Sequence, residues 1–116
     1  MERTRVSRVS DDQVLCASSR YEQKYYLNPR FNDTLPEQIK KELQAMMVLY
    51  TEDVGGILTL SYDEEGNLYF STTAAENDFE YDEIGAYLKI KQYQEKYKEL
   101  LEDMEVYYQT FFLGEE

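Results

Sequence analysis

Histidine and tryptophan are absent from this sequence, and it has one cysteine and two prolines. Without histidine, neither imidazole acid–base catalysis nor a zinc site with an imidazole ligand can form. A single cysteine cannot close an internal disulfide, which favours a reducing compartment and therefore a cytoplasmic protein. No stretch of about 18 apolar residues occurs, so no membrane span is expected. The N-terminus also lacks the apolar segment of a secretion signal.

Positive charge is in short supply as well. The chain has 12 Lys and Arg against 24 Asp and Glu, which gives a formal net charge of -12 over 116 residues. A surface with this excess of negative charge repels nucleic-acid phosphates, so no direct contact with nucleic acid is expected. A basic protein is the kind of partner that this charge would attract.

The acidic residues concentrate between Glu42 and Leu88, where no Lys or Arg occurs. Two interpretations stay open: a negative face that recruits a basic partner or imitates a polyanion, and a solvated surface that keeps the protein soluble. The residues predicted to form an acidic partner-binding face are Asp63, Glu64, Glu65, Asp78, Glu80, Asp82 and Glu83.

No motif in the sequence predicts a catalytic, cofactor or metal site. Asp78, Glu80 and Asp82 alternate as in a calcium loop, but Glu83 replaces the required glycine and Lys89 the closing acid. Cys16 lies in an apolar segment without a neighbouring base, which indicates a core residue. We therefore expect no cofactor and no enzymatic activity.

The length fits one domain, and we expect a flexible N-terminal tail over residues 1–13 and a single domain over 14–116. Two short apolar segments, 14–17 and 25–27, predict paired strands. A helix should follow, with Thr34 as its N-cap, Glu37 completing a capping box, and an end at Gly55-Gly56.

The second half of the chain repeats this order. Segments 57–62 and 68–72 alternate apolar and polar residues around a glycine-containing loop, which predicts a hairpin. A long helix should then begin near Asp82. The expected fold class is α+β, an antiparallel four-stranded sheet with two helices on one face in the order ββαββα.

The last helix has an unusually long apolar pattern. If it is helical from 83 to 113, it would be about 45 Å long, more than a domain of this size spans. Apolar residues recur at steps of three and four over three heptads, and a second apolar edge adds Leu101, Tyr108 and Phe112. We predict that these three residues form the interface of a homodimer. The repeating positions are Ile90, Tyr93, Tyr97, Leu100, Met104, Tyr107 and Phe111.

Several segments form a characteristic set: 14–17, 24–26, 28–29, 35–36, Glu52 with 55–56, 81–85 and 111–113. Together they resemble a family of small uncharacterised acidic proteins from anaerobic Gram-positive bacteria. The resemblance covers nearly the whole chain after the tail and implies no activity, ligand or catalytic residue. Small acidic dimeric secretion chaperones are similar in size and charge, at the level of the fold alone.

Three functional hypotheses follow. The leading one is a non-enzymatic cytosolic protein-binding domain that forms a homodimer and acts as a chaperone-like protein or regulatory adaptor. The alternative is an acidic decoy that inhibits a basic nucleic-acid-binding protein. The third is a small enzyme that uses carboxylates.

Overall fold

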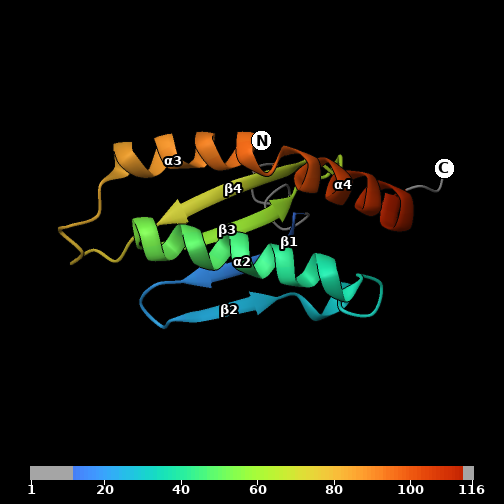
Figure 1. The fold of residues 1–116 in the computed structure, drawn as a ribbon, viewed down its shortest axis with the longest axis horizontal. Coiled ribbons are helices and arrows are strands. Elements are labelled where there is room, and N and C mark those ends of the chain that lie inside the picture. Colours follow the sequence, from blue (N-terminus) through green and yellow to red (C-terminus); the bar gives the residue numbers. More distant parts are fainter. Residues whose placement is uncertain (1–11, 114–116) are drawn as a thin grey trace, which may run out of the picture.

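The fold was analysed in a computed structural model, which describes residues 12–113. Its four strands form one antiparallel sheet in the order β2-β1-β3-β4, and three helices pack against it (Figure 1). This confirms the α+β class and the four-stranded sheet, with the elements in the order ββαββαα. The elements are β1 (Gln13–Ser19), β2 (Lys24–Leu27), η1 (Pro29–Phe31), α2 (Glu37–Val54), β3 (Ile57–Tyr62), β4 (Leu68–Thr73), α3 (Glu83–Lys96), α4 (Lys98–Tyr108) and η2 (Gln109–Leu113).

Most of the predicted tail, residues 1–11, lies outside the described residues. Asp12 and Gln13 are described, and β1 begins at Gln13, one residue before the expected domain boundary. Asp12 accepts a hydrogen bond of 2.6 Å from the Tyr69 hydroxyl of β4. The sheet therefore includes this end of the predicted tail.

One face of the sheet is buried, as the alternation in the sequence predicts. Leu58, Leu60 and Tyr62 of β3 are fully buried and belong to the same core cluster as the buried side chains of all three helices. In β1, a bulge between Val14 and Cys16 changes the register against β3. The bulge allows two successive side chains of this strand, Leu15 and Cys16, to be buried together.

The start of α2 differs from the prediction. The helix begins at Glu37 with Pro36 at the N-cap position, and no side chain caps it. Thr34 lies two residues too early for a capping box, and its hydroxyl instead hydrogen-bonds the Tyr107 hydroxyl at 2.5 Å. The capping-box prediction is therefore wrong, because a contact distant in sequence uses the threonine.

The predicted single helix over 83–113 is also wrong. It divides at Tyr97, whose φ of -107° and ψ of 25° are not helical, and α3 and α4 meet there at an angle (Figure 1). Tyr93 before the break and Leu100 after it are both buried in the core. A single straight helix of this length would extend beyond the domain, whereas the break allows both α3 and α4 to pack on the core.

A second irregularity changes which aromatic residues face the core. After α4, residues Gln109–Leu113 form a π-helical turn, which holds more residues per turn than an α-helix. Phe112 therefore packs inward, with its ring 5.2 Å from that of Phe31, while Phe111 is 63% exposed. The predicted three-four spacing holds as far as Tyr107 and ends there.

The described residues include no helix long and apolar enough to cross a membrane.

Truncating the inward aromatic residue Tyr108 should destabilise the domain strongly. Its ring lies 4.0 Å from that of Tyr62 in a stacked arrangement, and it is only 5% exposed. Tyr108→Ala should lower the free energy of unfolding by about 3 kcal/mol or more, as is usual for buried aromatics. In the monomer, Phe111→Ala should change it by less than about 0.5 kcal/mol, because that ring is exposed there. Urea unfolding followed by circular dichroism measures both, and equal effects would contradict the inward-outward assignment.

Candidate protein-binding surface

The three residues predicted to form a dimer interface pack mainly against other residues of the same chain. Tyr108 is buried between the rings of Tyr62 and Phe112, and Phe112 is half-buried against Phe31. Leu101 is half-buried and lines a small hollow between α4 and β4. These residues close the core of their own chain, so little of Tyr108 is left for a partner.

The predicted acidic face is divided between two places. Asp63, Glu64 and Glu65 lie in the β3–β4 turn, and the remaining four acids lie in or next to the loop that joins β4 to α3. These two connections are at opposite ends of β4 (Figure 1). Asp63 has a local role, because its Oδ1 accepts hydrogen bonds from the amides of Glu65 and Asn67 at 2.9 and 3.0 Å. The predicted face therefore consists of two separate acidic groups, and the group near α3 adjoins exposed apolar residues.

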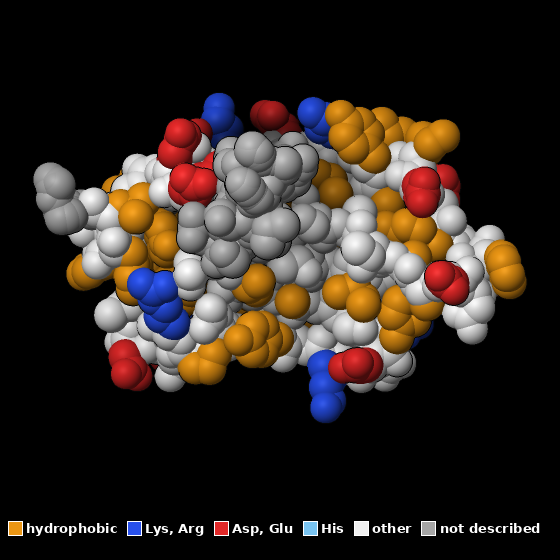
Figure 2. Space-filling view, turned by 180° about the vertical axis from the view of Figure 1, so that it is seen from behind, with side chains coloured by type: hydrophobic (Ala, Val, Ile, Leu, Met, Phe, Trp, Pro, Cys, Tyr) orange, Lys and Arg blue, Asp and Glu red, His pale blue; other side chains and the backbone are white. Residues whose placement is uncertain are grey.

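Beside these acids, large apolar side chains are exposed at the start of α3. Phe79 in the loop is 91% exposed, and Ile84, Tyr87 and Leu88 are 74%, 58% and 54% exposed. Positions 84, 87 and 88 are spaced by three and four residues, so they share one side of the helix. Hydrophobic side chains gather at the end of the molecule where α3 begins (Figure 2). We call these four residues the α3 surface.

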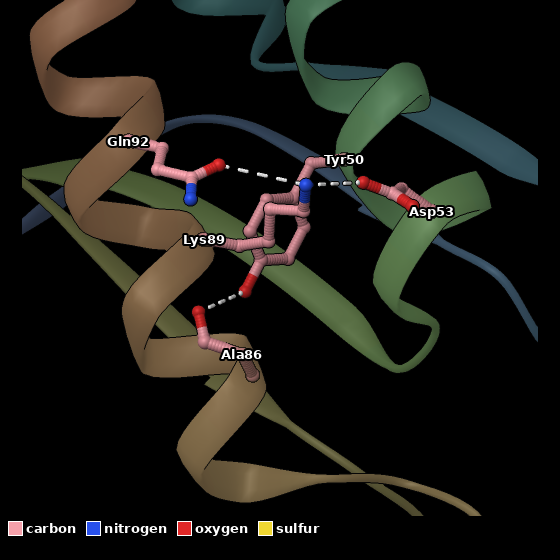
Figure 3. A network of polar contacts seen from close by, with 5 residues as sticks. All are labelled: Tyr50, Asp53, Ala86, Lys89 and Gln92. Carbon is pink, nitrogen blue, oxygen red and sulfur yellow. Dashed lines mark hydrogen bonds and ion pairs between the residues drawn. The ribbon is translucent and has the colours of Figure 1, made fainter.

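The opposite side of α3 is attached to α2. The Tyr50 hydroxyl donates a hydrogen bond of 2.9 Å to the carbonyl oxygen of Ala86, and the Lys89 ammonium lies 3.0 Å from the Asp53 carboxylate (Figure 3). Burial raises the pKa of Tyr50 to about 12, so the hydroxyl stays protonated and able to donate at neutral pH. These contacts fix the rotation of α3, and that rotation turns the α3 surface away from the core.

The loop before α3 is held from two sides. The hydroxyl of Tyr21, in the β1–β2 loop, donates to the Asp78 carboxylate at 2.6 Å and accepts from the Ala75 amide at 2.9 Å. The Tyr81 hydroxyl bonds that of Thr72 in β4 at 2.5 Å. Gly56 allows this approach, since a Cβ there would meet the Tyr81 ring at 2.8 Å. The loop therefore has a defined shape despite its exposed position.

Under this loop lies an open hollow of about 550 Å³, adjoining the α3 surface at Ile84. It combines carboxylates with the ring of Tyr81, and such a lining suits a lysine or arginine side chain. The residues that line it are Ala74, Ala75, Glu76, Asp78, Tyr81, Asp82, Glu83 and Ile84.

The described residues show no arrangement for catalysis through cysteine or a protein-bound metal. Cys16 is fully buried, and burial raises the pKa of its thiol to about 12, which leaves it protonated and unreactive. No group of three or more Cys, Asp and Glu in residues 12–113 is placed to hold a metal ion.

Sequence reasoning missed the α3 surface, although the pattern that indicates it is present. Positions 84, 87 and 88 form an apolar stripe, but they lie on the side of the helix opposite to Tyr93, which belongs to the stronger repeat. The longer repeat dominates the pattern of this segment, so the shorter stripe is not evident from spacing alone. Two apolar stripes on one helix indicate that one of them faces away from the core.

The bond between Tyr50 and α3 can be tested by removing one hydroxyl. Tyr50→Phe should lower the free energy of unfolding by about 1 kcal/mol, the usual contribution of one hydrogen bond. Tyr87→Phe, on the exposed side of α3, is the matched control and should leave it unchanged. Urea unfolding measures both, and a Tyr50 variant as stable as the wild type would show that this bond does not fix α3.

Comparison with known families gives a match that covers all of the described residues. Residues 12–116 match the model described as "Family of unknown function (DUF6145)". No curated protein and no solved structure matches the chain.

Proposed function

The chain belongs to DUF6145, a family of unknown function, and from its exposed α3 surface we propose that it is a non-enzymatic protein-binding domain of the cytosol. Its partner on the α3 surface is a basic protein that presents apolar side chains among its Lys and Arg residues. A regulatory adaptor of this kind suits the bacterial origin that the resemblance in sequence implies.

The exposed α3 surface is the observation that carries this proposal. A helix that only covers a sheet would place polar residues on its outer side. Here Ile84, Tyr87 and Leu88 are more than half exposed, and Phe79, in the loop that leads into α3, is almost fully exposed. Contiguous exposed apolar residues with a polar rim are typical of protein-binding sites.

The charge around the α3 surface selects the partner. The acids of the adjoining hollow are Glu76, Asp78, Asp82 and Glu83, and Glu80 is exposed in the same loop. One cation is close by, since the Lys91 ammonium lies 5.4 Å from the centre of the Tyr87 ring. Acids still outnumber this lysine, so opposite charge on a partner would increase the association rate and exclude acidic competitors.

The other hypotheses have less support. A decoy for a nucleic-acid-binding protein needs a continuous row of acids, whereas β4 separates the acids of 63–65 from those of 76–83. A carboxylate-using enzyme needs two acids facing each other across a cleft. The acids of the hollow under the loop surround one open depression, which fits a cationic side chain better than a sugar ring.

A model peptide can test the proposal. We expect a helical peptide of repeating leucine and lysine to bind the wild-type domain and to shift the NMR signals of residues 79–91. Replacing Ile84 and Leu88 together by serine should weaken binding about tenfold or more, because two exposed apolar contacts are lost. Isothermal titration calorimetry measures the affinity.

The matched control separates specific binding from general attraction to a negative protein. Tyr26→Ser removes a side chain that is 49% exposed on the edge strand β2, away from the α3 surface. It should bind the peptide like the wild type. Equal affinity in the Ile84/Leu88 variant and the wild type would mean attraction by net charge alone and would contradict the proposal.

The homodimer is a separate proposal. Because Tyr108 is used within the chain, the apolar residues available at this end are Val106 and Phe111, which are 62% and 63% exposed. Light scattering at micromolar concentration should give twice the chain mass of 13.8 kDa. Val106→Lys with Phe111→Lys should give a folded monomer. A wild-type mass of one chain would contradict the dimer without affecting the α3 surface.

A further inference from the structure

The two edges of the sheet differ in whether another part of the chain bonds a backbone group of the edge strand. At the β4 edge, the amide of Leu68 donates a hydrogen bond of 2.8 Å to the Glu105 carboxylate of α4, which occupies this backbone group. At the β2 edge, β1 is the one strand that pairs with β2, and no other described residue forms a backbone hydrogen bond with it. The β2 edge is thus open to a further strand.

The pairing register identifies the open backbone groups. In an antiparallel pair, residues alternate between those bonded to the neighbouring strand and those that point away from it. The Asn28 amide donates to the Leu15 carbonyl at 3.0 Å, and Tyr26 pairs with Ala17 two positions along. The amide and carbonyl groups of Tyr25 and Leu27 therefore point to the free edge.

An open groove of about 630 Å³ lies between this hairpin and α2. Its buried polar residues are Ser18 and Thr51, whose hydroxyls are 2.8 Å apart. Val48 and the Tyr25 ring add apolar surface. The residues that line the groove are Ser18, Ser19, Arg20, Gln23, Lys24, Tyr25, Gln44, Val48, Thr51 and Glu52.

The charge of this groove is opposite to that of the α3 surface. Arg20 and Lys24 line it, both are exposed, and neither forms an ion pair with another residue of 12–113. Glu52, on the α2 side, is the one acid among the lining residues. In a chain of net charge -12, two unpaired cations beside an open strand edge favour an acidic ligand.

We propose that the β2 edge binds an extended acidic peptide segment of a partner protein, which adds a fifth strand to the sheet. The peptide backbone bonds the open groups of Tyr25 and Leu27, and alternate side chains enter the groove. Its carboxylates pair with Arg20 and Lys24. The same two cations discourage a second copy of this chain from pairing at β2, because like charges would meet.

The probe for this proposal is a capped seven-residue peptide of alternating valine and glutamate. Amide hydrogen exchange followed by NMR should be fast at Tyr25 and Leu27 in the free domain and at least tenfold slower in the complex. The same peptide with alternate amides N-methylated should lose this protection. Binding without slower exchange at these two amides, or equal binding of the methylated peptide, would overturn the proposal.

Charge variants test the recognition of acids. Arg20→Glu with Lys24→Glu should weaken binding of the valine–glutamate peptide about tenfold or more. Lys41→Glu with Lys96→Glu, which changes two exposed lysines of α2 and α3 outside the groove by the same total charge, is the matched control and should have a smaller effect. Equal effects of the control and the Arg20/Lys24 variant would overturn the proposal. The α3 variants should leave this binding intact, so failure here is distinct from failure of the proposed function.

Discussion

The ring of Phe31 is the contact on which the closed end of the fold depends. It lies in the short turn η1 and is fully buried. The centre of its ring is within 6.2 Å of the centres of four aromatic rings on β3, α4 and η2. A single buried aromatic residue therefore joins segments that are far apart in the chain. The aromatic rings that meet it are Tyr62, Tyr107, Tyr108 and Phe112.

The position of this aromatic cluster determines which helix packs on the core and which helix stays exposed. Because it fixes α4 and η2 against the sheet, the inward aromatic residues of the C-terminal end are used for stability. The break at Tyr97 then frees α3 to follow α2, to which Tyr50 and Lys89 attach it. α3 has few buried side chains, Ala86 and Tyr93, so most of its surface faces outward. The packing of the aromatic rings therefore explains why α4 is mainly buried against the core and α3 is mainly exposed.

Local patterns in the sequence predicted the sheet well. The alternation in 57–62 depends on neighbouring residues alone, and Leu58 and Leu60 are buried as it requires. The same holds for the core position of Cys16 and for the helix end at Gly55, whose φ is 90°. These features are fixed by backbone geometry and by burial of one face.

Contacts between distant segments were beyond sequence reasoning. Thr34 bonds Tyr107, 73 positions away, rather than capping α2. No proline or glycine occurs between 86 and 113 to indicate the break at Tyr97 or the π-helical turn. The α3 surface was concealed by the stronger repeat, and the β2 groove exists only when β1, β2 and α2 are assembled. Local propensity specifies elements, whereas surfaces arise from their packing.

The placement of charge gives the two surfaces a common logic. The two surfaces lie close together at one end of the sheet. The hydroxyl of Tyr21, next to Arg20, donates a hydrogen bond of 2.6 Å to Asp78 of the acidic hollow. Salt screens charges over about 8–10 Å, so at low salt the opposite charges of these neighbouring surfaces would weaken the attraction of each for its own ligand. A basic partner on α3 and an acidic strand on β2 would not compete for the same residues. Under the two proposals, the domain would therefore bind two different proteins side by side.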